Sequence, residues 1–510
     1  MKKRYYITTP IYYVNDNPHI GHAYTTLACD VLARFKRLDD YEVMFLTGTD
    51  EHGQKVQIAA NKAGVSPQEF TDKVSKNFLY LTEKMNFSND CFIRTTEPRH
   101  YESCQKIWQK LMDNGHITLS AYSGWYSVRD EAFFAESELI DGKAPTGAPV
   151  EWVEEPSYFF DLSKWQQPLL DFYEKNPDFV APASRFNEIK RFVEGGLKDL
   201  SISRTTFDWG VPVPGDPEHV MYVWLDALTN YITATNWTEP NSEDFKNWWP
   251  ADLHMVGKDI LRFHAVYWPA FLMAAELDLP SRIFAHGWWT NEGEKISKSL
   301  GNVIDPITLI DKYGLDQIRY FLMREVPFGR DGDFSQSALL HRINSDLAND
   351  LGNLSQRVLS QIFKNLDGKI PSLPINLLDD DASLLAMLKE LPDKVRAQID
   401  NQSFHDALRQ IWNVIAEANR YVDKQAPWAL KKTDTDRMAD VLGVLVEVIR
   451  CVGLLTQPFM PDASAKILGQ IKVNESERTF VHLSDVNLLS GRIIEKPEGV
   501  FPRHQIAEEG

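Results

Sequence analysis

Two short polar motifs, far apart in the chain, combine residue types that could hold a triphosphate and support attack on it. The first is Pro18-His19-Ile20-Gly21-His22 and the second is Lys295-Ile296-Ser297-Lys298-Ser299. The first contributes two imidazoles and a glycine, and the second contributes two lysines and two hydroxyls. We predict that the two motifs form a split site for a triphosphate whose α-phosphate is attacked.

The first motif is expected where a helix begins. Aromatic and β-branched residues at 4–9 predict a preceding strand, and apolar residues at helical spacing from 20 to 35 predict the helix. His19 and His22 lie three residues apart, so we expect them on one side of the first turn, beside free backbone N–H groups that suit phosphate. Gly21 would allow a nucleotide to approach the backbone closely. A helix that merely carries two exposed histidines is the alternative.

The second motif follows a predicted strand at 282–287 and turn-forming residues at 291–294. Attack at an α-phosphate builds negative charge on the phosphorus and on the departing pyrophosphate. Lys295 and Lys298 on a mobile loop could meet that charge without any proton transfer. Considered alone, two lysines three residues apart more commonly belong to a basic loop exposed to solvent, and this is the alternative.

Composition limits the class of protein. The chain has 510 residues, which predicts two or three domains, and it contains no apolar run long enough to span a membrane and no apolar leader. Its four cysteines show no C-x-x-C spacing, which favours a reducing compartment and argues against a cysteine-rich zinc site. The net charge of −18 argues against coating nucleic acid by charge alone, although it allows a shaped RNA complex.

The order of predicted elements indicates an α/β nucleotide-binding fold of the Rossmann-like type, followed by an all-α bundle. Strands and helices alternate over residues 1–115 and again over 221–334. Residues 116–220 are aromatic and rich in turns, which predicts an inserted domain between these two halves. From 335 to 510 the chain is mainly helical, with helices expected near 336–363, 380–400, 404–424 and 435–456.

The two motifs, in this order, resemble the HIGH and KMSKS pair of class I aminoacyl-tRNA synthetases. The run 300–306 also resembles the continuation of the second motif in that class. From residue 5 to the 490s the chain resembles the methionyl-tRNA synthetases. The matching stretches are Thr9–Asn15, Thr47–Gly53, Tyr222–Leu228, Gly257–Ile260 and Ala426–Trp428.

The resemblance implies ATP-dependent ligation of L-methionine to tRNA(Met) through methionyl-adenylate, with release of AMP and pyrophosphate and with Mg²⁺ on the phosphates. Asp50 falls where the family binds the substrate ammonium, a charge-assisted contact. Aromatic and aliphatic residues enclose the polarisable thioether in this family. The implied pocket consists of Ile11, Tyr13, Trp224, Ala227, Leu228, Tyr231 and His264. Ordinary core packing is the alternative explanation of Trp224 and Tyr231, which share a helical face.

The resemblance also assigns residues to ATP and to tRNA. His19, His22, Lys295 and Lys298 are the implied catalytic residues, and they bind ATP together with Gly21, Gly257 and Asp259; His286 and Trp289 are expected beside the adenine. The implied readers of the CAU anticodon are Asn353 and Arg357, which lie four residues apart on a predicted helix, and Trp428, which could stack on a base. Without the resemblance, a solvated helix face would explain Asn353 and Arg357.

Two departures from the family lead to expectations of absence. Many members carry zinc-binding cysteine pairs in the inserted domain and a C-terminal extension. This chain lacks the cysteine pairs, so we expect no zinc or other structural metal, and it lacks the extension, so we expect a monomer. The cysteine spacing and the lack of an apolar leader predict a cytoplasmic protein. Synthetases for leucine, isoleucine and valine usually carry a larger inserted editing domain, which disfavours them. A non-catalytic RNA-binding or amino-acid-sensing relative is disfavoured because the phosphate-handling histidines and lysines are intact.

Overall fold

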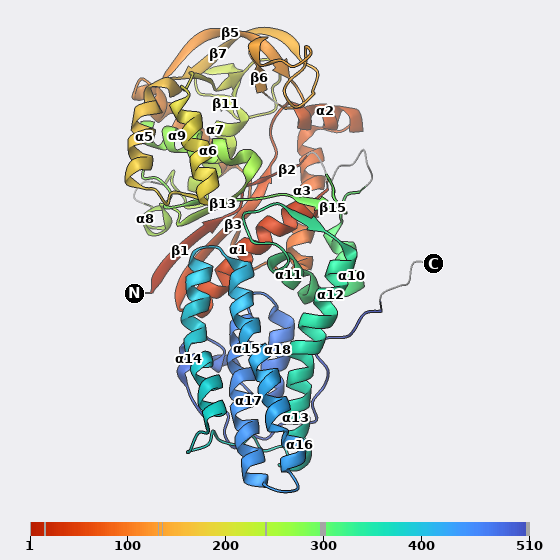
Figure 1. The fold of residues 1–510 in the computed structure, drawn as a ribbon. Coiled ribbons are helices and arrows are strands. Elements are labelled where there is room, and N and C mark those ends of the chain that lie inside the picture. Colours follow the sequence, from red (N-terminus) through yellow and green to blue (C-terminus); the bar gives the residue numbers. More distant parts are fainter. Residues whose placement is uncertain are drawn as a thin grey trace. The chain divides into compact units, whose positions relative to one another are not determined.

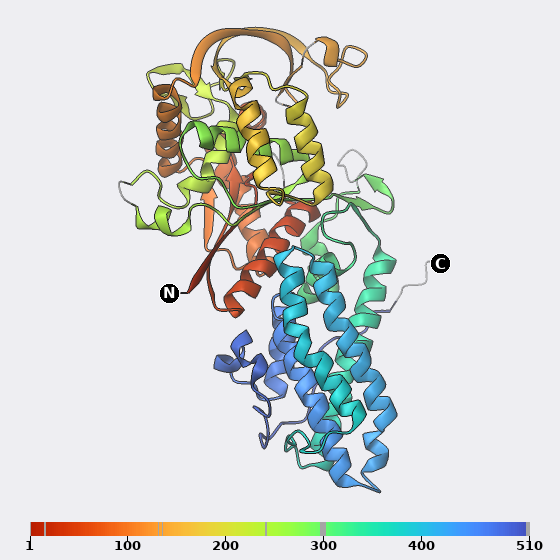
Figure 2. The same cartoon turned by 60° about the vertical axis from the view of Figure 1, so that its left-hand side comes forward.

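The structure is a computed structural model that describes residues 2–14, 17–130, 132–134, 136–239, 242–295 and 302–505. It falls into two compact units (Figures 1 and 2). The first unit contains Met1–Lys3, His19–Val43 and Gly287–Gly510, and the second contains Arg4–Pro18 and Met44–His286. Each unit is described by itself. Across the described ranges, no helix is both long enough and apolar enough to cross a membrane.

The second unit is built on a sheet with the strand order β2-β3-β1-β13-β14-β8, and β4 pairs with β3. The pairs β2–β3, β3–β4, β1–β13, β13–β14 and β14–β8 are parallel. The predicted strands at 4–9 and 282–287 are confirmed as β1 and β14. The strands are β1 (Lys3–Thr8), β2 (Tyr12–Tyr13), β3 (Tyr41–Asp50), β4 (Cys91–Arg94), β8 (Val180–Ala181), β13 (Leu253–Gly257) and β14 (Ile283–His286).

Helices of the second unit contribute large side chains to its core. Trp108 and Trp268 are fully buried, as is Tyr231. A π-helical turn, Phe263–Tyr267, leads directly into α9. The helices are α2 (Gln54–Ala63), α3 (Pro67–Lys84), α4 (Pro98–Asp113), α5 (Gln166–Lys175), α6 (Ala183–Glu194), α7 (Val223–Thr233), α8 (Glu243–Trp248) and α9 (Trp268–Ala274).

Antiparallel sheets interrupt the parallel arrangement. One has the order β6-β5-β7-β9, and its strands β5 and β7 form the long hairpin drawn in orange in Figure 1. The other has the order β10-β12-β11. Their strands are β5 (Ile117–Ser127), β6 (Ala132–Phe134), β7 (Glu151–Phe160), β9 (Leu200–Ser201), β10 (Ser203–Arg204), β11 (Pro212–Val213) and β12 (Asp216–Met221). The sequence did not predict that residues 116–220, expected as an inserted domain, also supply β8 to the parallel sheet.

The first unit contains α1, a small sheet of order β16-β15-β17, and the C-terminal helices. The hairpin between β15 and β16 turns at Glu292 and Gly293, both of which have positive φ, and this confirms the predicted turn. The strands are β15 (Trp289–Asn291), β16 (Glu294–Lys295) and β17 (Gly332–Phe334).

The four predicted C-terminal helices are confirmed, with one difference. The first is α-helical only at its ends, in α12 and α13, because Ile343–Gly352 between them is π-helical. Every residue of α17 from Val441 to Thr456 is buried, and α17 packs against α13, α14, α15, α16 and α18, so it is the central helix of the bundle (Figure 1). The helices are α1 (Ile20–Leu38), α10 (Pro306–Tyr313), α11 (Leu315–Arg324), α12 (Gln336–Arg342), α13 (Asn353–Asn365), α14 (Asp379–Asp400), α15 (Phe404–Gln425), α16 (Pro427–Leu430), α17 (Thr435–Thr456) and α18 (Pro461–Gln470).

Candidate functional site

The two histidines of the first motif cap the helix that they begin. His19 is the N-cap of α1, and its Nδ1 accepts from the backbone N–H of Gly21 at 3.1 Å. Nδ1 of His22 accepts from the backbone N–H of His19 at 3.0 Å, and the N–H of Ile20 donates to the carbonyl of Ile304. The prediction of free N–H groups here is therefore wrong for this conformation, because the imidazoles and a neighbouring carbonyl occupy them.

The capping arrangement decides which nitrogen carries the proton. Burial lowers the pKa of His19, and burial together with the neighbouring His19 ring lowers the pKa of His22 well below its ordinary value. Both rings are therefore neutral at pH 7. Because Nδ1 accepts in each, the proton is on Nε2, where it can be donated. The ring centroids lie 4.0 Å apart, which confirms that the two side chains share one side of the helix.

Gly21 is required by His19 itself. A Cβ at position 21 would lie 2.9 Å from Cε1 and 3.1 Å from Nδ1 of the His19 ring. Any larger residue would have to displace the imidazole from the cap. The glycine therefore has a local packing reason in addition to the close approach of a nucleotide that the sequence predicted.

Of the second motif, the structure describes only the start. Lys295 ends β16, and residues 296–301, including Lys298, lie outside the described residues. The side-chain amide of Asn291 donates to the carbonyl of Asn302 at 3.0 Å. This hydrogen bond brings together the two ends of the segment that contains the second motif. Trp289, which the sequence placed beside the adenine, packs edge-on against Tyr24 with centroids 5.4 Å apart and is buried.

In the second unit, the residues expected at ATP meet where β13 and β14 end. Gly257 is the last residue of β13, and it lies in register with His286, the last residue of β14. A Cβ at Gly257 would lie 2.6 Å from a carboxylate oxygen of Asp259 and 3.9 Å from the His286 ring. The carboxyl ends of parallel strands are where open α/β sheets bind ligands.

Helix α7 and the π-helical turn place three aromatic residues of the predicted pocket together. The ring of Trp224 stacks on Phe263, with centroids 3.6 Å apart and an interplanar angle of 8°. Trp224 also meets the His264 ring edge-on at 6.3 Å, and Tyr231 meets it at 5.8 Å. Sequence reasoning missed Phe263, which had no signal of its own beside the neighbouring aromatic residues. Ala227 and Leu228, also on α7, are buried.

A buried hydrogen bond joins Tyr231 to His264 and has a defined direction. Nδ1 of His264 lies 2.9 Å from the carbonyl of Ile260, which can only accept, so Nδ1 carries a proton. Burial lowers the pKa of His264 to about 4, so its Nε2 is unprotonated at pH 7. The Tyr231 hydroxyl, 2.7 Å away, therefore donates to Nε2. The carbonyl of Tyr231 in turn accepts from the hydroxyl of Tyr6 at 2.8 Å.

Asp50 ends β3 and lies in register with Tyr13 of β2, so the structure brings these two predicted residues side by side. Ile11, just before β2, is partly buried against the same core as Trp224. The loop after Asp50 is strongly held. Glu51 is fully buried and pairs with Arg94 through two hydrogen bonds of 2.7 and 2.8 Å.

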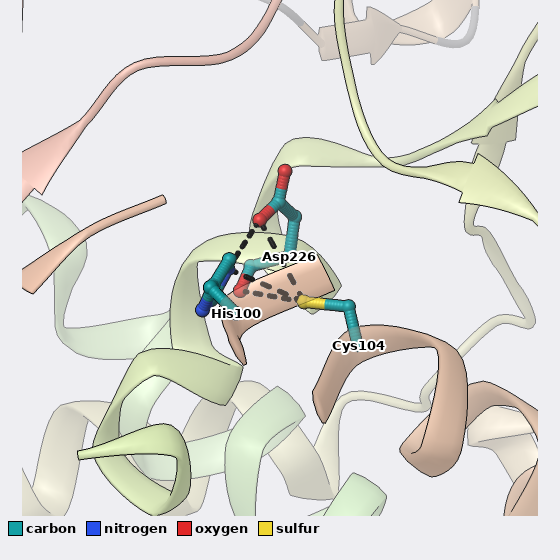
Figure 3. A group of neighbouring side chains, drawn as sticks. All are labelled: His100, Cys104 and Asp226. Atoms are coloured by element: carbon teal, nitrogen blue, oxygen red, sulfur yellow. Dashed lines mark hydrogen bonds and ion pairs between the residues drawn. The ribbon is translucent and has the colours of Figure 1, made fainter. Parts of the chain in front are cut away.

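One cluster has the residue types of a metal site. Figure 3 shows His100 and Cys104, one turn apart on α4, pointing toward Asp226 of α7, and all three side chains are buried. Nε2 of His100 lies 2.7 Å from a carboxylate oxygen of Asp226. Ligand atoms around tetrahedral zinc are about 3.3–3.6 Å apart, given bond lengths of ~2.0–2.3 Å. The 2.7 Å between His100 and Asp226 is shorter than this and fits a direct hydrogen bond between them.

In the first unit, Arg357 and Trp428 come together and Asn353 lies exposed one turn away. The Arg357 guanidinium lies over the Trp428 ring, 5.1 Å from its centroid, and pairs with Asp423 at 2.5 Å. Both residues line a cavity of about 220 Å³ between α13, α15, α16 and α17. Trp428 is 40% exposed, so its ring remains accessible to a planar ligand.

Comparisons with known proteins agree over the whole chain. A family model described as class I tRNA synthetases (M) matches residues 5–151 and 137–359, and a model described as the anticodon binding domain of methionyl tRNA ligase matches 376–509. The chain is 58% identical to a methionine–tRNA ligase of Rickettsia felis, over 99% of each chain. It is 56% identical to that of Mesorhizobium japonicum, over 99% of this chain and 98% of the other.

Solved structures show the same likeness. The crystal structure of Mycobacterium tuberculosis methionyl-tRNA synthetase bound by methionyl-adenylate superposes with a TM-score of 0.95 at 52% identity, covering 98% of this chain and 100% of that one. The apo form of the same enzyme superposes with a TM-score of 0.90 at 49% identity, covering 99% of each chain.

Proposed function

The chain belongs to the methionyl-tRNA synthetases of class I, and on that premise we propose that it ligates L-methionine to tRNA(Met) at the expense of ATP. The reaction has two steps. The methionine carboxylate attacks the α-phosphate of ATP to form methionyl-adenylate and pyrophosphate, and a terminal ribose hydroxyl of the tRNA then attacks the mixed anhydride and releases AMP. The observation that carries the proposal is the near-complete match to an enzyme with bound methionyl-adenylate.

For the first step, we assign charge stabilisation to the two motifs. The Nε2–H groups of His19 and His22 donate to phosphate oxygens, and Lys295 and Lys298 meet the charge that develops on the pyrophosphate. The neutral state of both histidines supports this role, because a neutral ring donates from Nε2 without holding the charged product too tightly. Mg²⁺ enters with ATP as part of the substrate and neutralises phosphate charge. Gly257, Asp259 and His286 bind the nucleoside, and no side chain acts as nucleophile.

For methionine, we assign the ammonium to Asp50 and the side chain to the pocket of Ile11, Tyr13, Trp224, Ala227, Leu228, Tyr231 and His264. The hydrogen bond between Tyr231 and His264 supports this assignment. With the hydroxyl proton directed at His264, the pocket offers ring edges and no strong donor to the thioether, and sulfur favours such contacts. A charged or strongly hydrogen-bonding side chain would find no partner there and would pay its desolvation cost.

For the second step, we assign anticodon recognition to Asn353, Arg357 and Trp428. The exposed Trp428 ring, already covered on one side by the Arg357 guanidinium, is suited to stacking on an unpaired base. Asn353 is exposed on the same helix as Arg357 and offers both a donor and an acceptor to a base edge.

We also propose residues 1–115 and 221–334 as the two halves of the catalytic domain, 116–220 as the inserted domain and 335–510 as the anticodon-binding domain. We propose that the protein is a monomer, that it works in the cytoplasm, where its tRNA is charged, and that it holds no structural zinc. The absence of cysteine from 116–220 supports the last point. So does Asp130, which accepts hydrogen bonds from Ser127 at 2.9 Å and Thr146 at 2.5 Å and thus joins segments of the insertion without a metal.

The test is amino-acid-dependent exchange of pyrophosphate into ATP, run with each of the twenty amino acids and without tRNA. Exchange with methionine alone is expected and would establish both adenylation and the pocket. Exchange with leucine or isoleucine would retain the phosphate site and overturn the pocket assignment. An absence of exchange with every amino acid would count against adenylation. In the same assay, Lys298→Ala should lower the exchange rate about 10²–10³-fold with methionine affinity nearly unchanged.

A further inference from the structure

Two different segments of the chain supply the proposed contacts to methionine. Asp50 stands at the end of β3, followed by the loop Glu51–Gly53, whereas Trp224 and Tyr231 stand on α7. A carboxylate directs an ammonium only if its distance to the rest of the pocket is fixed. Whatever joins the loop to α7 therefore sets how the two ends of the substrate are held relative to each other.

A histidine–aspartate array makes such a connection. Nδ1 of His52 lies 2.7 Å from Oδ2 of Asp226, the residue directly before Ala227 on α7. The other oxygen of Asp226 lies 2.7 Å from Nε2 of His100 on α4. A dashed line marks this contact in Figure 3. Nε2 of His52 lies 2.9 Å from the hydroxyl of Tyr101, also on α4. Three segments far apart in the sequence thus meet at one carboxylate.

The array is buried and carries charge. His52, His100 and Asp226 are each no more than 1% exposed. Burial opposes ionisation of Asp226, but the two imidazoles outweigh it and hold the pKa of Asp226 below its ordinary value. A carboxylate can only accept, so both imidazoles direct an N–H at it. A buried ionised group of this kind is weak evidence for stability, because apolar residues of similar volume often serve as well. What it does provide is a defined geometry.

The loop itself is fixed on its other side. Glu51 is held by Arg94, Thr49 and Thr96, and the Trp209 indole N–H donates to the Glu51 carbonyl at 2.6 Å. These contacts hold the loop to β4 and to the segment before β11. The hydrogen bond between His52 and Asp226 adds a direct link from this loop to α7.

We propose that His52 and Asp226 are positioning residues that hold the ammonium-binding carboxylate of Asp50 in register with the thioether pocket on α7. They touch neither methionine nor ATP and act through Asp50. This inference deepens the proposed function and rests on it. It predicts that loss of the array weakens recognition of the ammonium specifically, and leaves binding of the thioether side chain nearly unchanged.

The experiment compares two inhibitors of methionine-dependent pyrophosphate exchange. L-Methioninol has the thioether side chain and the ammonium, and 4-(methylthio)butan-1-ol has the same chain without the ammonium. Inhibition constants are measured for the wild type, Asp226→Asn, His52→Leu and His52→Asn. Asn places an N–H close to the position of Nδ1 in histidine, so His52→Asn is the conservative variant. His116→Leu, which removes a partly exposed contact to Asp161 at 3.1 Å in the same unit, is the matched control.

We expect the inhibition constant of L-methioninol to rise about 10-fold or more in Asp226→Asn and His52→Leu, as for a weakened charge-assisted hydrogen bond. That of 4-(methylthio)butan-1-ol should change less than about two-fold, since it has no charge for Asp50 to meet. His52→Asn should recover most of the loss, and His116→Leu should match the wild type. If Asp226→Asn does not fold, His52→Leu carries the test.

An equal rise for both inhibitors would overturn the proposal, since it would show that the array only maintains the shape of the unit. No rise for either would overturn it as well, as would a failure of His52→Asn to improve on His52→Leu. A wild type that L-methioninol does not inhibit would instead count against the proposed function. The two failures are therefore distinguishable.

Discussion

Arg319 anchors the helix that carries the first motif, and its removal should strongly destabilise the first unit. The side chain of Arg319, on α11, is fully buried. Its Nη2 donates to Asp30 of α1 at 2.6 Å and to the carbonyl of Pro458 at 2.8 Å, and its Nε donates to the carbonyl of Phe459 at 3.0 Å. One guanidinium thus joins α1 to the turn between α17 and α18.

The expected magnitude follows from what each substitution leaves behind. Arg319→Met removes these hydrogen bonds and leaves the buried Asp30 carboxylate, which Arg34 also contacts at 2.8 Å, without the guanidinium. Asp30→Leu leaves the buried guanidinium of Arg319 without its carboxylate. Removing one partner of a buried pair costs about 3–5 kcal/mol, a change of roughly 10²–10³-fold or more in the unfolding equilibrium. In the double variant no buried charge is left alone, so its loss should fall short of the sum of the single losses by about 2 kcal/mol.

Urea unfolding followed by circular dichroism at 222 nm measures these differences. Lys394→Met is the control, because the pair of Lys394 with Glu390 is exposed and should contribute little to the free energy of unfolding. A decrease of less than about 1 kcal/mol in the free energy of unfolding of Arg319→Met would refute the reasoning. So would losses that add within about 0.5 kcal/mol in the double variant, which would mean that the two residues do not act as a pair.

Three further predictions concern the two candidate binding sites. Tyr231→Phe removes the donor to the buried Nε2 of His264, so the KM for methionine in pyrophosphate exchange should rise about 10-fold while the KM for ATP stays unchanged. A rise in the KM for ATP alone would contradict the assignment of Tyr231 to the methionine pocket. Burial lowers the pKa of His264 to about 4, so between about pH 6.5 and 4 the unfolded chain binds a proton there that the folded chain does not. The contribution of His264 to the free energy of unfolding is therefore intact above pH 6.5 and is lost as the pH falls toward 4. Between pH 7 and 5 the free energy of unfolding should fall about 2 kcal/mol more in the wild type than in His264→Gln, measured by urea unfolding at both pH values. Arg357→Gln removes the guanidinium over Trp428 and should raise the KM for tRNA in aminoacylation at least about 10-fold. A lower rate of pyrophosphate exchange without tRNA would contradict a role confined to tRNA binding.

Much of the fold could be predicted because its signals are local. The strand before His19, the helix after it, the turn at Glu292 and Gly293, and the long helices of the bundle all follow from apolar period and turn-forming residues, which act within one element. The exceptions are elements whose cause lies elsewhere in the chain. β8 is only two residues long and exists because β14 offers it an edge. The π-helical segment Ile343–Gly352 has the same apolar spacing as an α-helix and carries no sequence signal of its own.

The candidate site divides in the same way. The family resemblance supplied residue types and positions, and their roles in binding stay predictions. Neither the resemblance nor residue spacing indicated that the imidazoles of His19 and His22 would cap α1, because a cap depends on side-chain rotamers as well as on spacing. Phe263 was missed because one more aromatic residue in an aromatic run gives no separate signal.

The sequence by itself determined the type of protein and the order of its main elements, since motifs and periodicity are properties of neighbouring residues. Which residues carry the chemistry stays a prediction from the sequence. Only the tertiary structure decided how those residues are held. His52 and Asp226 are 174 positions apart, and Asp30 and Arg319 are 289 apart. Each pair becomes a short, buried contact only once packing has removed water from around it. The strength and direction of such contacts come from that low-dielectric surrounding, which no stretch of sequence contains.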